Sequence, residues 1–159
     1  MRLPEYNYSQ GGTYFLTVCI RRRICCLSSI CVGGGALDAP QVRLTAYGAV
    51  VREWIHGCHS IYSDLTVEKY VVMPNHIHLL VTLRDGPSGA PAPTERRTNQ
   101  RIPLFISALK RMTAKRCGEN IWQDGYYDHV VRNEEDYLRI WNYIHTNPAK
   151  WAEDKYYVP

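Results

Sequence analysis

Two strand-forming segments separated by only two residues constrain the fold of this chain more than any other feature. Residues 65–73 and 76–83 are rich in β-branched and aliphatic side chains, and Pro74-Asn75 forms a tight break between them. So short a connection favours two antiparallel neighbours in one sheet. Side chains alternate between the faces of a strand, so His76 and His78 project from the same face of the second segment.

This histidine pair has two interpretations. Two imidazoles on one rigid face can hold a divalent cation, since imidazole is a ligand for several transition metals. The alternative is a pair of partly exposed strand histidines that bind nothing. The His-x-His spacing by itself leaves both interpretations open.

The other elements are predicted from hydrophobic periodicity and from residues that start or stop helices. In chain order they are a strand at 13–20, a helix at about 44–59, the two strands above, a helix at 103–117, a strand at 126–132 and a helix at 133–147. This β-α-β-β-α-β-α order predicts an α+β protein. We expect a ferredoxin-like βαββαβ antiparallel sheet with helices on one face and an added C-terminal helix.

A length of 159 residues suits one domain with a real core, so we expect a single domain over 1–159. Residues from about 84 to 102 are rich in Gly, Pro and polar side chains, which predicts a flexible insertion. No segment approaches the roughly 20 apolar residues that span a bilayer, and the N-terminus has no apolar signal region. We therefore expect a cytoplasmic protein without a membrane partner, whose six cysteines are reduced.

The charge of the chain is compatible with a polyanionic partner. The formal net charge is +4 and the pI is about 8.7. Basic residues cluster after the first strand, on the helix at 103–117 and before the last helix, and each can equally be a solvated surface charge. The candidate phosphate contacts are Arg21, Arg22, Arg23, Lys110, Arg111, Lys115, Arg116 and Arg132.

The last predicted helix carries a candidate nucleophile, Tyr143. Tyr137, Trp141 and Ile144 fall on one packing stripe of this helix, whereas Tyr143 lies about 120° from Tyr137 on the helical wheel. Asn147 lies one turn beyond Tyr143 on the same line, where its oxygen could complete a metal site with His76 and His78. Alternatively, Tyr143 is an ordinary surface tyrosine and Asn147 is a residue that ends the helix before Pro148. Tyr137 is the second candidate nucleophile.

Three segments in this order resemble the single-tyrosine HUH transposases, and most closely the REP-associated tyrosine transposases. They are Met73-Pro74-Asn75-His76-Ile77-His78-Leu79-Leu80-Val81, Ile121-Trp122-Gln123-Asp124-Gly125-Tyr126-Tyr127-Asp128-His129 and Tyr143-Ile144-His145-Thr146-Asn147-Pro148. The resemblance extends from Gly11 to about Trp151. The loop at 84–101 is long for this family.

The resemblance implies a metal-dependent strand transferase that acts on single-stranded or hairpin DNA. His76, His78 and Asn147 would bind Mg²⁺ or Mn²⁺, which polarises the scissile phosphate. Tyr143 would attack that phosphate and form a 5′-phosphotyrosine link with release of a 3′-OH, so that rejoining needs no ATP. The partner would be palindromic-repeat DNA, and the protein would be nucleoid-associated in the cytoplasm.

Two other functions remain open at this point. A domesticated descendant could hold DNA hairpins without cutting them, and a metal hydrolase could use the same histidines with an activated water. The resemblance also leaves the oligomeric state open, because related transposases include both monomers and dimers that exchange their tyrosine helices.

Overall fold

A four-stranded antiparallel sheet in the order β4-β5-β1-β6 forms the centre of the computed structural model, which describes residues 11–31, 39–84 and 101–159. The strands are β1 (Gly12–Cys19), β4 (Leu65–Val72), β5 (His76–Leu83) and β6 (Tyr127–Val131). As predicted, β4 and β5 are antiparallel neighbours. The tight turn is closed by a hydrogen bond of 2.9 Å from the Met73 amide to the His76 carbonyl.

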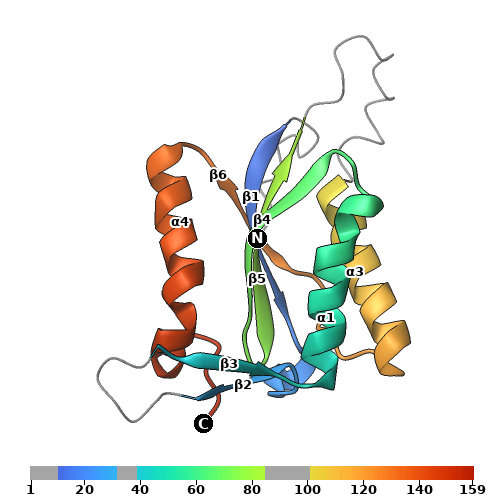
Figure 1. Ribbon diagram of the computed structural model, residues 1–159, viewed down its shortest axis with the longest axis vertical. Coiled ribbons are helices and arrows are strands. Elements are labelled where there is room, and N and C mark those ends of the chain that lie inside the picture. The colour runs from blue at the N-terminus through green and yellow to red at the C-terminus, as the bar shows by residue number, and fades with distance from the viewer. Residues whose placement is uncertain (1–10, 32–38, 85–100) are drawn as a thin grey trace.

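Helices cover both faces of the sheet. The helices α1 (Ala46–Gly57) and α3 (Arg101–Cys117) pack on one face, and α4 (Glu134–Thr146) packs on the other (Figure 1). The predicted α+β fold with a ferredoxin-like antiparallel sheet and a C-terminal helix is confirmed. Asn133 caps α4 as expected, because its side chain accepts a hydrogen bond of 2.8 Å from the Asp136 amide.

The two faces of β5 have different surroundings. Ile77, Leu79 and Val81 point into the larger core, where they meet residues of α1 and α3 such as Trp54, Phe105 and Leu109. On the other face Leu80 packs against Ile140 and Ile144 of α4. Strand alternation therefore places His76 and His78 on the α4 face, and both are fully buried.

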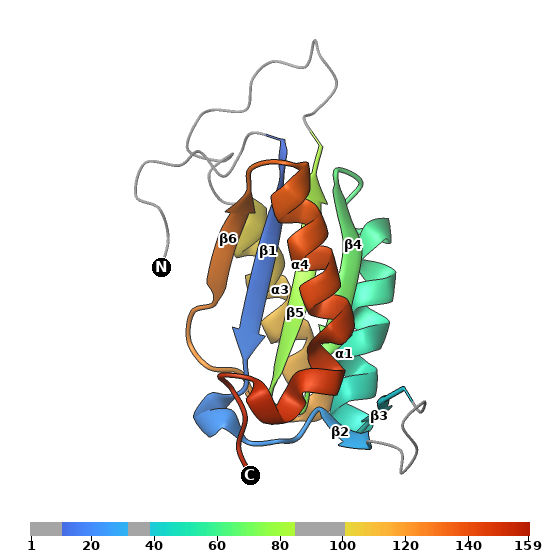
Figure 2. The ribbon, with the colours of Figure 1, turned by 90° about the vertical axis from the view of Figure 1, so that its left-hand side faces the viewer.

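Among the described residues, three 3-10 segments connect or extend these elements: the single turns η1 (Arg21–Arg23) and η2 (Cys58–Ser60), and the seven-residue η3 (Asn147–Glu153). η3 follows α4 directly and turns the chain beneath the start of β5, so that the C-terminal segment lies beside η1 (Figure 2). The contacts are a hydrogen bond of 3.2 Å from Arg23 to the Lys155 carbonyl and one of 2.8 Å from Asn75 to the Tyr156 carbonyl.

The structure differs from the sequence prediction at two places in the chain. A separate two-stranded sheet of β2 (Ser28–Cys31) and β3 (Gln41–Leu44) was not predicted, because four-residue strands with mixed exposure carry little periodic signal. Helix α3 begins at Arg101, two residues before the predicted start at Pro103. The predicted flexible insertion falls mostly on residues 85–100, which lie outside the described residues. Within the described part of the chain, no helix is long and apolar enough to cross a bilayer.

Candidate metal and nucleophile site

The two histidines of β5 meet through their outer ring nitrogens. His76 Nε2 and His78 Nε2 lie 3.1 Å apart, and the rings are exposed by 0% and 1%. Burial lowers the pKa of His76 to about 4, although the nearby Asp154 carboxylate opposes this shift. Burial also lowers the pKa of His78, as does the proximity of His76. Both rings are therefore neutral near pH 7, which is the state that binds metal ions.

Asn75 fixes the orientation of the first ring. Its amide nitrogen donates to the carbonyls of Arg23 and Tyr156, at 3.3 and 2.8 Å, so its side-chain oxygen is the acceptor. His76 Nδ1 lies 2.9 Å from that oxygen and must donate to it. The lone pair of the neutral His76 ring is therefore on Nε2, which faces His78.

Thr17 contacts Nδ1 of the second ring, as Asn75 contacts Nδ1 of the first. It is directly opposite His78 in the β1–β5 pairing, and its hydroxyl lies 2.8 Å from His78 Nδ1. A hydroxyl can donate or accept, so Thr17 stabilises either tautomer of His78. When it accepts from Nδ1, the lone pair of His78 Nε2 is directed toward His76.

A carboxylate that the sequence analysis missed completes the cluster. Ligand atoms of His76, His78 and Asp154 all lie within 4.8 Å of one another. Asp154 follows η3, in an irregular segment beyond the helical line that linked Tyr143 to Asn147. No periodic pattern extends to this position, so the sequence carried no signal for it.

Tyr143 of α4 reaches this cluster from the same chain. Its phenol oxygen lies 3.4 Å from His78 Nε2 and donates over 3.4 Å to Asp154 Oδ2. The deeply buried residues of α4 are Ile140 and Ile144, and Tyr143 lies about 60° to one side of Ile140 on the helical wheel. The tyrosine therefore stands at the edge of the packed face, 38% exposed, with its ring edge-on to Phe15 at 5.9 Å.

Asn147 lies between the phenol and the carboxylate, one turn beyond Tyr143. Its amide nitrogen donates to Asp154 Oδ2 at 3.0 Å, while its side-chain oxygen is buried without a hydrogen-bond partner among the described residues. A buried acceptor without a partner costs about 1–3 kcal/mol. That oxygen is therefore an available ligand for a cation or for a hydrogen-bond donor.

The electrostatic environment of the phenol disfavours ionisation in the ion-free protein. Burial raises the pKa of Tyr143, and the Asp154 charge raises it further, whereas a hydrogen bond from Asn147 opposes these effects. A cation between the histidines and Asp154 would offset the carboxylate charge. The arrangement therefore has the features of a nucleophile that requires a metal for activation.

The donor set matches a divalent cation. Two adjacent ligands of an octahedral ion at about 2.1 Å are separated by about 3.0 Å, and the histidine nitrogens lie 3.1 Å apart. The available donors are two neutral imidazoles, one carboxylate and one amide oxygen without a partner. This mixture suits the intermediate transition metals and Mg²⁺ better than thiolate-preferring ions.

The second candidate nucleophile, Tyr137, and the histidines His56 and His129 lie away from this cluster. Tyr137 stacks on Trp141 at 5.9 Å and packs in the small core beneath α4. His129 pairs with Asp136 at 2.7 Å, and His56 contacts the Tyr70 hydroxyl at 2.5 Å.

The predicted phosphate contacts divide into separate groups. Arg21, Arg22 and Arg23 form η1, whose last two residues have left-handed φ angles of 56° and 55°, and Arg23 stacks over the Tyr156 ring near the histidines. Lys110 donates to the carbonyls of Gln123 and Gly125, and Arg116 pairs with Glu53 at 2.6 Å. Arg111 and Lys115 are exposed on α3, across the sheet from Tyr143, and Arg132 precedes α4 at the end farther from the site. DNA binding by these residues stays a prediction.

The Trp-Gln motif has a structural function in this fold. Trp122 is 1% exposed, pairs with Ile20 in an isolated bridge and donates from its indole to Thr113 at 2.8 Å. The Gln123 amide donates to the Cys19 carbonyl at 2.9 Å. This loop holds the end of β1 and the start of η1 in place beside the histidines.

Known proteins resemble this chain in both sequence and structure. It is 28% identical to the REP-associated tyrosine transposase of Escherichia coli (strain K12), over 93% of this chain and 74% of that protein. It is 27% identical to an uncharacterized protein of Haemophilus influenzae, over 99% of this chain and 92% of the relative. No protein-family model matches the chain.

A solved structure of a REP-associated tyrosine transposase bound to a REP hairpin superimposes with a TM-score of 0.61. The two chains are 27% identical, and the match covers 94% of this chain and 74% of the other. These matches confirm the resemblance that the three motifs predicted.

Proposed function

We propose that this chain, a relative of the REP-associated tyrosine transposases, cuts and rejoins single-stranded DNA next to hairpins. The proposal rests on one contact. The phenol oxygen of Tyr143 lies 3.4 Å from Nε2 of His78, which belongs to the buried histidine pair. A structural tyrosine does not require two neutral, oriented imidazoles beside its hydroxyl. The relative named for its REP hairpin supports the choice of hairpin DNA as partner.

Four side chains would hold the metal, which we propose to be Mg²⁺ or Mn²⁺. His76 and His78 supply ring nitrogens, Asp154 a carboxylate oxygen and Asn147 its amide oxygen. The ion, when bound, polarises the scissile phosphate and offsets negative charge that develops in the transition state. Asn75 and Thr17 orient the two rings, so the ligands need little rearrangement when the ion binds.

Tyr143 acts as the nucleophile in this proposal. Its oxygen forms a bond to phosphorus as the bond between phosphorus and the 3′-oxygen breaks, and the leaving oxygen takes up a proton as a 3′-OH. The phenol proton passes to solvent, to which Tyr143 is 38% exposed. The reverse reaction with another 3′-OH releases the tyrosine and joins the strands, which conserves bond energy without ATP.

The test is a covalent-adduct assay on a denaturing gel with Mn²⁺ and a pool of labelled hairpins that carry varied single-stranded flanks. The wild-type chain should form a protein–DNA adduct, Tyr143→Phe should form none, and Tyr137→Phe is the matched control that retains it. An adduct with Tyr143→Phe would refute the assignment. Hairpin retention by the wild type without any adduct would instead favour the non-cutting binding protein. Multiple turnover without an adduct would favour the hydrolase.

A further inference from the structure

A groove of 580 Å³ opens beside Tyr143, between the outer side of α4 and the segment that follows it. Its walls include Tyr143, Asn147 and Asp154, so it is continuous with the candidate site. Sites that enclose small ligands have volumes of about 300–1,000 Å³. This groove therefore has room for a nucleotide or two of a single strand and is too small for a duplex.

The charged side chains that line the groove are mainly basic. Lys150, Lys155 and Arg139 contribute cations, although Arg139 also pairs with Asp136, and Glu153 and Asp154 contribute acids. Asp154 is turned inward, where it accepts hydrogen bonds from Asn147 and Tyr143. The remaining balance favours an anionic occupant, and a cation bound by Asp154 would increase that preference.

Polar helix residues complete the lining. Asn142 and Thr146 belong to the same outer side of α4 as Arg139, and they supply hydrogen-bonding groups rather than apolar surface. A sugar–phosphate backbone needs this combination of cations and polar groups.

Lys155 connects the groove to the histidines. Its ammonium lies 4.8 Å from the centre of the Tyr156 ring, and that ring lies 4.6 Å from the His76 ring. The Arg23 guanidinium approaches the same aromatic ring at 5.5 Å. Positive charge from Lys155 and Arg23 therefore lies next to the aromatic ring that contacts His76.

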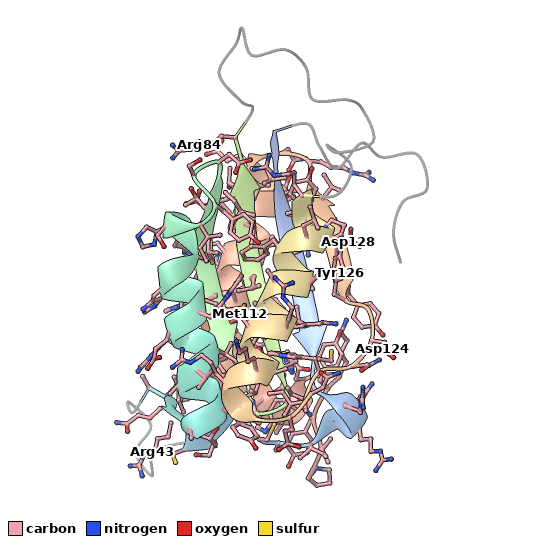
Figure 3. All side chains as sticks on the ribbon, turned by 90° about the vertical axis from the view of Figure 1, so that its right-hand side faces the viewer. Arg43, Arg84, Met112, Asp124, Tyr126 and Asp128 are labelled. Carbon is pink, nitrogen blue, oxygen red and sulfur yellow. The ribbon has the colours of Figure 1, made fainter. Side chains whose placement is uncertain are left out.

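The basic residues of α3 cannot contact the DNA strand that occupies this groove. Figure 3 shows the opposite side of the molecule, where α1 and α3 lie in front and Met112 is labelled on α3. Arg111 and Lys115 are exposed on α3, so the whole sheet separates them from Tyr143. A DNA strand that presents a phosphate to Tyr143 lies next to the groove, whereas α3 is on the other face of the sheet.

We propose that this groove holds the single-stranded DNA segment that carries the scissile phosphate, with Lys150 and Lys155 as its backbone phosphate contacts. The inference rests on the proposed function, because it assumes that the strand presents a phosphate to Tyr143. It moves the main phosphate contacts from α3 to η3, which contains Lys150, and to Lys155 just beyond it. Both lysines are exposed, so their replacement should leave the fold intact.

The test is DNA binding without chemistry, measured by fluorescence anisotropy in EDTA in a Tyr143→Phe background. One probe is a labelled hairpin with an oligothymidine extension, and the other is the same hairpin with a blunt end. Backbone binding is independent of base sequence, so the natural target need not be known. Lys150→Ala and Lys155→Ala should each reduce the slope of log affinity against log salt by about 0.7 for the extended probe.

Two controls make the assay specific. Lys115→Ala removes an exposed lysine from the other face and should leave the extension-dependent affinity unchanged. Glu153→Gln removes an acid from the groove and should strengthen binding of the extended probe. The blunt hairpin should respond to none of the four changes.

The proposal would be overturned if Lys150→Ala and Lys155→Ala reduced the affinity for the blunt and extended probes equally. It would also be overturned if the salt slope changed only in Lys115→Ala. The outcome is separable from that of the adduct assay. Altered slopes without any covalent adduct would retain the groove as a binding site and reject the chemistry. A covalent adduct with unaltered slopes would retain the chemistry and reject the groove.

Discussion

The phenol oxygen of Tyr143 lies 3.4 Å from His78 Nε2 within one polypeptide. The tyrosine comes from the helix after the last strand of the sheet and the histidine from β5, so the fold of a single copy brings them together. A dimer that exchanges tyrosine helices is not needed to complete the cluster.

We therefore expect that two inactive variants cannot complement each other. A mixture of Tyr143→Phe and His78→Ala chains should form no covalent DNA adduct under conditions in which the wild type forms one. As a control, the wild-type chain is diluted into either variant, and its activity per wild-type molecule should stay unchanged. Recovery of a substantial fraction of wild-type activity in the mixture would instead show a site shared between copies.

Asp154 lies outside the three motifs, yet we expect it to contribute strongly to metal affinity. Asp154→Asn keeps the shape of the side chain and removes its charge, so we expect the Kd for Mn²⁺ to rise about tenfold or more. Isothermal titration calorimetry measures the effect. Glu153→Gln is the matched control, because it removes the neighbouring acid from a groove position and should change the Kd by less than about twofold. Equal effects of the two substitutions would contradict a ligand role for Asp154.

Thr17 should affect metal binding through the orientation of His78. Thr17→Val preserves the shape of the side chain and removes the hydroxyl that lies 2.8 Å from His78 Nδ1. We expect the Kd for Mn²⁺ to rise about 10–100-fold and the protein to lose about 1–3 kcal/mol of stability.

Thr13→Val is a control on the same strand. It removes a hydroxyl pair with Thr82, 3.0 Å apart, away from the histidines. This variant should lose some stability and retain wild-type Mn²⁺ affinity. If both threonine variants lowered the metal affinity equally, general loosening of the sheet would be the cause.

The buried histidines should make the metal-free protein sensitive to acid. The unfolded chain protonates its histidines near pH 6.5, whereas burial lowers the pKa of His76 to about 4 in the folded state. The unfolded state binds more protons between these values, so stability should be at its full level above about pH 6.5 and fall as the pH decreases toward 4. Thermal unfolding in EDTA measures this dependence.

A His76→Gln variant should show a weaker decrease in melting temperature over the same pH range. Addition of Mn²⁺ should raise the wild-type melting temperature near pH 7 and lose this effect in acid, because protons compete for the same ring nitrogens. A melting temperature that is independent of pH between these limits would contradict the burial of neutral rings.

Local patterns were sufficient for most of the fold. The strand-forming side chains of 76–83 predicted β5 with its observed bounds. Because the side-chain period of a strand is two, both histidines were placed on one face. Asn133 caps the start of α4, and Gly118, with a φ of 80°, follows the last residue of α3; both signals depend only on nearby residues. The β2–β3 pair was missed, since two short strands become stable only when paired with each other.

Local sequence patterns identify the side chains available for chemistry: a histidine pair on one strand face, and a tyrosine with an asparagine one turn later. The packing of separate elements adds Asp154 to them, orients the rings through Thr17 and Asn75, and brings Lys150 and Lys155 beside the site. Periodic elements repeat their geometry along the chain, so neighbours on one helix or strand can be predicted. Contacts between β5, α4 and the irregular C-terminal segment depend on how separate elements pack, and no local pattern encodes them.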